Sequence, residues 1–191
     1  LISIGESAFE ECRQLTSIIL PNSLESISNN AFRNCSNLGG INLPSTLQEL
    51  GFYAFYGCEN VKSVVLPESL ETIEIGTFEA SGIESIVFPS NLKMIEESAF
   101  ANCEGLTRLE LPEGVQTIGM RCFDGCTNLE SINLPDSISS VGAVAFYGCT
   151  KLTSIDLPAN VTVLSGSVFA ESGLTSIVIP NTVARVESNA L

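Results

Sequence analysis

Apolar and polar positions along the chain follow one arrangement that returns every 22 or 23 residues. The repeated unit reads L-x-x-I-x-L-P-x-x-L-x-x-I-G-x-x-A-F-x-x-C-x-x, and the polar positions between its apolar ones vary. Self-similarity at such a period is typical of solenoids, in which each unit stacks on its neighbours. Eight phenylalanines mark the units: Phe9, Phe32, Phe55, Phe78, Phe100, Phe123, Phe146 and Phe169.

The first part of the unit predicts a β-strand. In L-x-x-I-x-L the isoleucine and the second leucine are two residues apart, so both point to one face of a strand. Stacked units would place these strands in a parallel sheet, about 4.8 Å apart. The proline that follows lacks an N–H for the ladder and ends the strand. For the return path we expect a short extended segment near Leu24 and Ile27, then a tight or helical turn at Ala31 and Phe32.

The cysteines indicate that the array consists of two similar blocks. Six of the seven cysteines lie three residues after a unit's phenylalanine, and the column is interrupted by Ser81 and Ser172, whose units are one residue shorter. Three units of 23 residues and one of 22 make a block of 91, which explains why AFYGC occurs at 54–58 and again at 145–149. We therefore expect residues 1–191 to form a single array of about eight units and a partial terminal unit, in two four-unit blocks. Because the chain begins and ends within patterned segments, we interpret it as a fragment of a longer protein.

These motifs resemble a known repeat family. The L-x-x-I-x-L strand motif, the proline and the A-F-x-x-C ending together resemble the BspA-like (treponemal-type) leucine-rich repeat, over essentially all 191 residues. The resemblance implies a leucine-rich-repeat solenoid, a right-handed superhelix of β-dominated α/β-type repeats. A parallel β-sheet would form its concave face, with short strands and helical or 3-10 turns on the return side. The sequence departs from the pattern at Cys122, which replaces the alanine before Phe123, and at Ala190–Leu191, where Ala-Phe is expected.

The charge balance excludes some partners. The chain has 22 acidic and 8 basic residues, a net charge of −14, with 45% hydrophobic residues. Nucleic-acid and polybasic membrane sites need clustered Lys and Arg, so neither partner is expected. No apolar run reaches the roughly 18 residues of a membrane span, so we expect no direct membrane insertion.

No residue constellation indicates a chemistry. The chain has no histidine, which excludes Ser-His-Asp triads, Cys-His pairs and histidine zinc sites. We predict no catalytic, metal-binding or cofactor-binding residues, and interpret the cysteines as buried, reduced thiols; a disulfide or metal role is the alternative. The sequence leaves open whether the glycosylation acceptors at Asn34 and Asn160 are used.

The resemblance also implies a function. BspA-like proteins are typically surface or secreted proteins implicated in adhesion. We therefore expect a non-enzymatic adhesion and protein-interaction module, located extracellularly or at the cell surface. Its partner would be a protein of a host or neighbouring cell surface or of the extracellular matrix. The alternatives are a passive spacer or stalk, an accessory binding domain of a larger extracellular enzyme and, least favoured, an enzyme that uses carboxylates paired across coils.

The strand positions between inward residues give a candidate binding surface. These outward columns are monotonous at both ends of the array and charged in its middle units. We expect one mixed, net-negative patch on the concave face, while a solvated surface without a partner is the alternative. The candidate protein-binding residues are Lys62, Glu84, Arg108, Glu110, Glu130 and Asp156.

Overall fold

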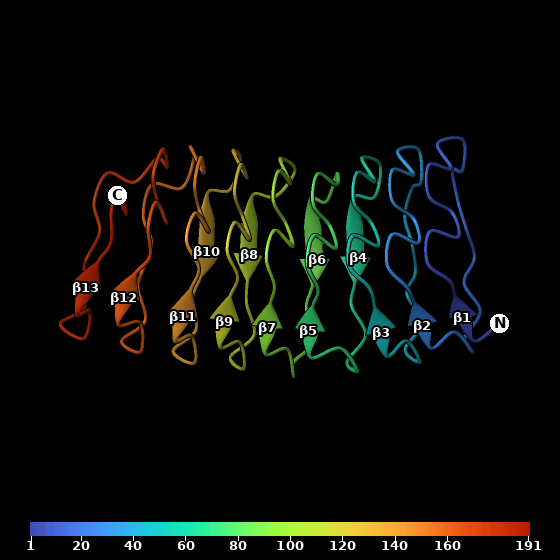
Figure 1. Ribbon diagram of the computed structural model, residues 1–191, viewed down its shortest axis with the longest axis horizontal. Coiled ribbons are helices and arrows are strands. Elements are labelled where there is room, and N and C mark those ends of the chain that lie inside the picture. Colours follow the sequence, from blue (N-terminus) through green and yellow to red (C-terminus); the bar gives the residue numbers. More distant parts are fainter.

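The computed structural model describes all of residues 1–191 as a row of stacked coils, with the two termini at opposite ends (Figure 1). Each complete coil contributes two extended segments, which form two sets of parallel strands. The first strand set comes from the L-x-x-I-x-L motif and its strands have three residues. It comprises β4 (Ser63–Val65), β6 (Ser85–Val87), β8 (Arg108–Glu110) and β10 (Ser131–Asn133).

The second strand set comes from the apolar pair after the proline, and its strands have two residues. In every strand of the set except β13 at the end of the array, one member of the pair, such as Ile27 or Ile73, is buried in the core. The set comprises β1 (Ser3–Ile4), β2 (Ser26–Ile27), β3 (Glu49–Leu50), β5 (Thr72–Ile73), β7 (Met94–Ile95), β9 (Thr117–Ile118), β11 (Ser140–Val141), β12 (Val163–Leu164) and β13 (Arg185–Val186).

Every paired strand runs parallel to the equivalent strand of a neighbouring coil. Ile27 stands opposite Leu50, and Val64 opposite Ile86, so equivalent residues of successive units lie in register. This is the parallel-sheet solenoid that the periodicity predicts, and that prediction is confirmed.

The phenylalanines form a continuous stack through the core. Phe32, Phe55 and the four that follow are fully buried, whereas Phe9 in the first coil is only partly buried. Neighbouring rings lie 5.1 to 5.7 Å apart between centroids, with interplanar angles of 2° to 15°. This spacing lies within the range favourable for aromatic pairs, so the stack adds an attraction between coils to the burial of apolar area.

The segment around each phenylalanine is a run of tight turns. Asn30 and Asn34 have φ angles of 57° and 58°, the left-handed conformation that the third residue of a type II turn requires. Between them, the N–H of Phe32 donates to the carbonyl oxygen of Ala54 in the next coil at 2.9 Å. A helix would use these amides within its own segment, whereas here alternate amides bind the neighbouring coil. The predicted helical or 3-10 turn is therefore wrong, and the structure contains no helix.

The two strand sets do not bond every junction between coils. β3 and β5 lie in separate sheets and stand apart in Figure 1, and the same is true of β11 and β12. We count each coil from a strand of the second set to the strand of the first set that follows it, so that β3 and β4 belong to one coil and β5 and β6 to the next. At both junctions the first strand set is hydrogen-bonded instead, through β4 with β6 and through a bridge between Asp156 and Val178. We call these places the β3–β5 opening and the β11–β12 opening.

Both openings precede a 22-residue unit, and they lie 91 residues apart. In each short unit a glycine passes directly over the backbone of the preceding coil. A Cβ added at Gly82 would lie 1.7 Å from the carbonyl oxygen of Glu59, and one at Gly173 would lie 2.2 Å from that of Thr150. The shortened loop thus draws its coil onto the preceding one at this point, while the second strand set parts.

Candidate functional site

All six residues of the predicted charged patch are exposed, and all but Asp156 belong to a strand of the first set or directly precede one. Lys62 and Glu84 form an ion pair across β4 and β6, with 3.5 Å between Nζ and Oε1. Their side chains are 54% and 60% exposed, so the pair contributes little to stability. Its charges remain accessible to a partner.

Arg108 and Glu110 lie at the two ends of β8, opposite Ser131 and Asn133 of β10. Arg108 forms no ion pair within the protein. Glu130 directly precedes β10 and is exposed.

The patch residues fall on three separately paired groups of strands. β4 and β6 form one sheet, and β8 and β10 form another. Asp156 lies outside both, in the isolated bridge to Val178. The structure thus brings Lys62 and Glu84 together and places Arg108 and Glu110 on one strand.

Aliphatic side chains share the outward column of Glu110 and Asp156. Val65 and Val87 stand opposite each other on β4 and β6 and are 62% and 57% exposed. Ile19 is also exposed. Exposed aliphatic groups beside charged ones give the surface the mixed character that protein interfaces have.

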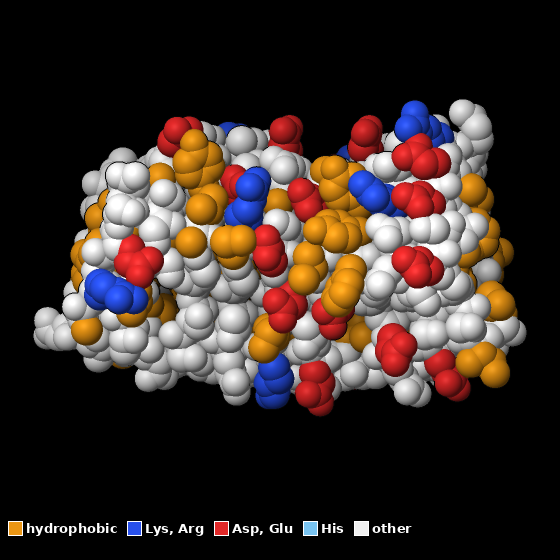
Figure 2. Space-filling model, viewed as in Figure 1, with side chains coloured by type: hydrophobic (Ala, Val, Ile, Leu, Met, Phe, Trp, Pro, Cys, Tyr) orange, Lys and Arg blue, Asp and Glu red, His pale blue; other side chains and the backbone are white.

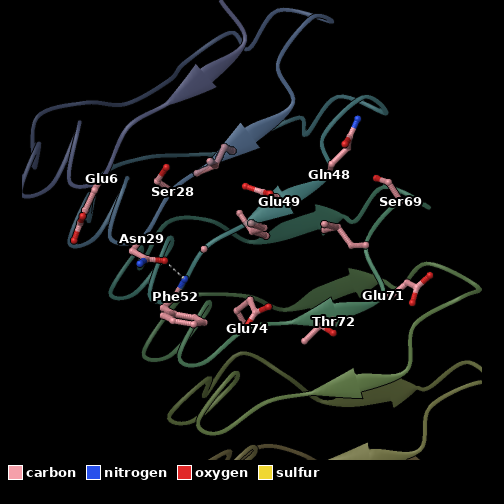
Figure 3. Close-up of a pocket in the computed structure, with 14 residues that line it drawn as sticks. Glu6, Ser28, Asn29, Gln48, Glu49, Phe52, Ser69, Glu71, Thr72 and Glu74 are labelled. Carbon is pink, nitrogen blue, oxygen red and sulfur yellow. Dashed lines mark hydrogen bonds between the residues drawn. The ribbon is translucent and has the colours of Figure 1, made fainter.

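A second surface feature lies at the β3–β5 opening. An open groove of about 670 Å³ follows the two parted strands, a volume within the range of ligand-binding clefts. Figure 3 shows Gln48, Ser69 and Glu71 towards one end of the groove and Phe52 and Glu74 towards the other. Most of the lining residues are polar.

Backbone groups at both edges of this groove lack partners within the protein. The carbonyl oxygens of Gln48 and Leu50 accept no hydrogen bond, and the N–H groups of Glu71, Thr72 and Glu74 donate none. At the next junction the equivalent groups are paired, since the carbonyl oxygen of Glu71 accepts two backbone hydrogen bonds from 93–94. The groove is therefore bordered by two unpaired strand edges.

The groove is strongly acidic. Glu6, Glu49, Glu71 and Glu74 contribute carboxyl groups, no Lys or Arg lines it, and none of the four forms an ion pair. Partial burial raises the pKa of the Glu74 carboxyl, and the neighbouring charge of Glu96 raises that pKa further. On the face shown in Figure 2, acidic side chains are spread over the region of β2, β3 and β5 and basic ones are few.

One exposed aromatic ring lies in the groove. Phe52 is 41% exposed, and its N–H donates to Oδ1 of Asn29 in the preceding coil at 2.9 Å, as the dashed line in Figure 3 marks. This contact fixes the backbone from which the ring projects.

Sequence reasoning missed the groove, although a comparison of the two blocks contains the signal. Ninety-one residues after Glu49, Phe52, Glu71 and Glu74, the second block has small or uncharged residues. A difference confined to one block marks positions that the repeat itself does not require. The second-block residues are Ser140, Ala143, Thr162 and Ser165.

The cysteine column carries no reactive thiol in the core. The Sγ of Cys58 donates to the carbonyl oxygen of Phe32 at 3.1 Å, and equivalent contacts recur along the column. Burial raises the pKa of Cys35 to about 11 and of Cys58 and Cys103 to about 12, which keeps these thiols protonated at neutral pH. Cys122 is buried as predicted, whereas Cys12, in the first coil, is exposed.

Metal-binding groups and membrane-spanning helices are both absent from the structure. No group of three or more Cys, Asp or Glu side chains is arranged to hold a metal ion. The structure has no helix of the length and apolarity needed to cross a bilayer.

The comparison with protein families covers the whole chain. The model of the BspA type leucine rich repeat region matches residues 1–104 and 73–191, in six copies. The chain belongs to this family. The BspA-type repeat therefore accounts for the strand motif, the proline and the Ala-Phe turn together, and the resemblance stated from the sequence is confirmed.

Solved structures of bacterial leucine-rich repeat proteins are similar to this BspA-type array. A leucine-rich repeat protein from Bacteroides ovatus is 32% identical with a TM-score of 0.94, and the match covers 97% of this chain and 49% of that one. A leucine rich cell surface protein from Faecalibacterium prausnitzii is 27% identical with a TM-score of 0.66, covering 100% and 60%. The leucine-rich repeat protein of T. pallidum, at 24% identity and a TM-score of 0.57, covering 92% and 70%, shares the fold.

The chain thus spans about half the length of the Bacteroides ovatus protein and 60% of the Faecalibacterium prausnitzii protein. Among proteins of curated function, none matches it closely enough to count as a relative.

Proposed function

We propose that this BspA-type array is a non-enzymatic protein-interaction and adhesion module of a bacterial cell-surface or secreted protein. Its family supports this role, as does its similarity to a protein described as a cell surface protein. The partner would be a protein of a host or neighbouring cell surface or of the extracellular matrix, and the location extracellular.

One observation favours binding over a passive spacer: the outward side chains of the first strand set differ from coil to coil. A stalk needs only a soluble surface, whereas this one has charged residues on β8 and directly before β4, β6 and β10, beside exposed Val65 and Val87. Arg108 is exposed and forms no ion pair, so it is available to a carboxylate of a partner. The candidate site is Lys62, Glu84, Arg108, Glu110, Glu130 and Asp156.

The test is a charge reversal within one strand. Extracellular-matrix and cell-surface extracts are passed over the immobilised array, and each retained protein is purified and measured by surface plasmon resonance. The double variant Arg108→Glu with Glu110→Arg keeps the net charge, and we expect a slower association rate and an altered salt dependence. The control, Lys151→Glu with Glu113→Lys, exchanges exposed charges outside the strands.

Unchanged kinetics in the first variant would move the site away from β8. The absence of any retained protein would favour the spacer or stalk. A catalytic domain elsewhere in the full-length protein would favour the remaining alternative, an accessory binding domain of an extracellular enzyme.

A further inference from the structure

We propose that the β3–β5 opening binds an extended, Lys- or Arg-containing peptide segment of a partner, which pairs its backbone with the unpaired strand edges. This site belongs to the second strand set, and it is independent of the charged patch on the first.

The unpaired edges give the proposal its geometry. In every other parallel pair of the second strand set, the backbone of one coil satisfies the backbone of the next. At the opening, the carbonyl oxygens of Gln48 and Leu50 face the groove from β3, and the N–H groups of Glu71, Thr72 and Glu74 face it from β5. An extended peptide has donors and acceptors at the same spacing and binds such edges by adding a strand. Four extended residues, about 13 Å, suffice to follow residues 48–51.

The charge of the lining identifies the peptide. Glu49, Glu71 and Glu74 lie on or beside the two strands, without a cation among the lining residues. A peptide with Lys or Arg at alternate positions would direct these side chains to one face of its strand, towards the carboxylates. Complementary charges of this kind increase the association rate and select the partner.

The ring of Phe52 offers a further contact. Its exposed face can cover the aliphatic part of a Lys or Arg side chain, and its π-system attracts the cationic end. Because the N–H of Phe52 is bound to Asn29, the ring projects from a fixed backbone.

The second block supplies an internal comparison. The β11–β12 opening has the same place in its coil, so an opening alone does not define the site. There Oγ of Ser165 donates to the carbonyl oxygen of Val141 at 2.7 Å, which spans the two strands with a side chain. Glu74, the residue equivalent to Ser165, makes no such bond. In the first opening a side-chain hydrogen bond crosses only at the end, from Oγ of Ser69 to the carbonyl oxygen of Leu47, and the strands themselves are unbridged and acidic. In the second opening the strands are bridged, and the positions equivalent to Glu49, Glu71 and Glu74 are uncharged.

The experiment uses the whole chain and a fluorescent hexapeptide of alternating Lys and Val. Fluorescence anisotropy gives its Kd at several salt concentrations. The first comparison peptide has Glu in place of Lys. The second keeps every Lys but is N-methylated at alternate amides and cannot donate their hydrogen bonds. We expect the Lys-Val peptide to bind, the Glu-Val peptide not to bind, and N-methylation to weaken binding on the order of tenfold.

The variants take their substitutions from the second block, whose backbone already accommodates them. The triple variant Glu49→Ser, Glu71→Thr, Glu74→Ser should weaken binding of the Lys-Val peptide on the order of tenfold. The control is Glu11→Asn, Glu25→Gln, Glu59→Thr, which removes three exposed charges outside both the groove and the charged patch, and it also takes its residues from the second block. It should keep nearly the wild-type Kd. Melting curves establish that both triple variants fold.

Three results would overturn the proposal. The Lys-Val peptide could fail to bind at millimolar concentration. The control triple variant could lose as much affinity as the groove variant, which would mean general attraction to an acidic protein. The N-methylated peptide could bind as well as the unmethylated Lys-Val peptide, which would rule out backbone pairing as the mode of binding. None of these results bears on the charged patch, because the Arg108 and Glu110 variant tests that surface separately.

Discussion

The thiol of Cys103 donates a hydrogen bond to the carbonyl oxygen of Phe78 in the preceding coil at 3.0 Å. The same carbonyl already accepts the N–H of Ser81 at 3.0 Å, so both of its lone pairs are used. The cysteine column is thus a row of small buried groups that join one coil to the next, and the stacking that buries them also suppresses their reactivity.

We predict that a thiol reagent at pH 8 distinguishes one cysteine from the other six. Cys12 is exposed and should react within the mixing time, whereas the buried thiols have a raised pKa, about 12 for Cys58, and should react only when the fold opens. Titration in native buffer should give one equivalent, and titration in denaturant without reductant should give seven. A total below seven would mean that disulfides exist in the protein.

The stability lost when a phenylalanine of the stack is truncated should depend on its position in the array. Phe55 is fully buried between two stacked neighbours, and Phe55→Ala should destabilise the array by about 3–5 kcal/mol. Phe169 stacks on Phe146 alone, so Phe169→Ala should affect mainly the last coils. Urea unfolding followed by circular dichroism measures both. Equal midpoints for the two variants would contradict a stability that passes between neighbouring coils.

The glycine of a short unit should resist substitution. In Gly82→Ala the new Cβ would meet the Glu59 carbonyl oxygen, and the displaced backbone should cost about 1–3 kcal/mol or more. Gly5→Ala is the control, since nothing lies within 4 Å of its added Cβ. Thermal unfolding compares the two, and a near-neutral Gly82→Ala would mean that the coils do not meet this closely.

Much of this architecture could be predicted from the sequence, because burial dictates the residue type at each core position. Phe32 has an equivalent phenylalanine in every full unit, Cys35 an equivalent cysteine in all but the short units, and Leu38 an equivalent Leu, Val or Ile, so these columns identify the stacked core. The turns were predicted less well: Ala31 is a good helix former locally, but the amide of Phe32 binds the next coil, which a single unit cannot indicate. The openings arise because each short unit lacks one residue. The effect of that deletion on the distance between coils cannot be inferred from residue types, so the openings were not predicted.

The two candidate sites also differ in how far the sequence could predict them. The exposure of Lys62 and Arg108 follows from strand alternation and was predictable. The groove was not, because its edges are backbone groups of Gln48, Leu50 and Thr72, whose hydrogen bonding depends on the neighbouring coil rather than on their side chains.

Among the turn residues with positive φ, Val144 is the β-branched one, and its replacement should stabilise the protein. Val144 has a φ of 63°, which costs a β-branched residue roughly 1–2 kcal/mol. Val144→Gly should raise the free energy of unfolding by about 1 kcal/mol. The neighbouring Ala143→Gly has no positive φ to relieve and should lower it by about 0.5–1 kcal/mol. Chemical denaturation of the two variants measures both free energies of unfolding. A loss of stability in Val144→Gly would contradict the strain assigned to Val144.

The carboxyl of Glu74 should make stability depend on pH. Burial, with the charge of Glu96, raises its pKa in the folded state, so the folded protein holds this proton more tightly than the unfolded chain. Its favourable contribution is therefore complete below the unfolded pKa, near 4.5, and is lost as the pH rises through the raised value. Glu74→Gln removes this loss, and its melting temperature should exceed that of the wild type by more at pH 7 than at pH 4. The exposed Glu71→Gln is the control, and an equal pH profile in it would assign the effect to net charge alone.

The alternation of bonded and open sides gives the array a direction-dependent stiffness. Between the coils of β3 and β5 the first strand set is paired and the second is parted, whereas between those of β6 and β8 the reverse holds. Bending that widens a paired side must break backbone hydrogen bonds, but bending that narrows an open side breaks none. Each of these two junctions is therefore compliant in one sense and rigid in the other. Because the compliant sides lie on different strand sets, the stack can adjust its curvature to a rigid surface while its core remains continuous.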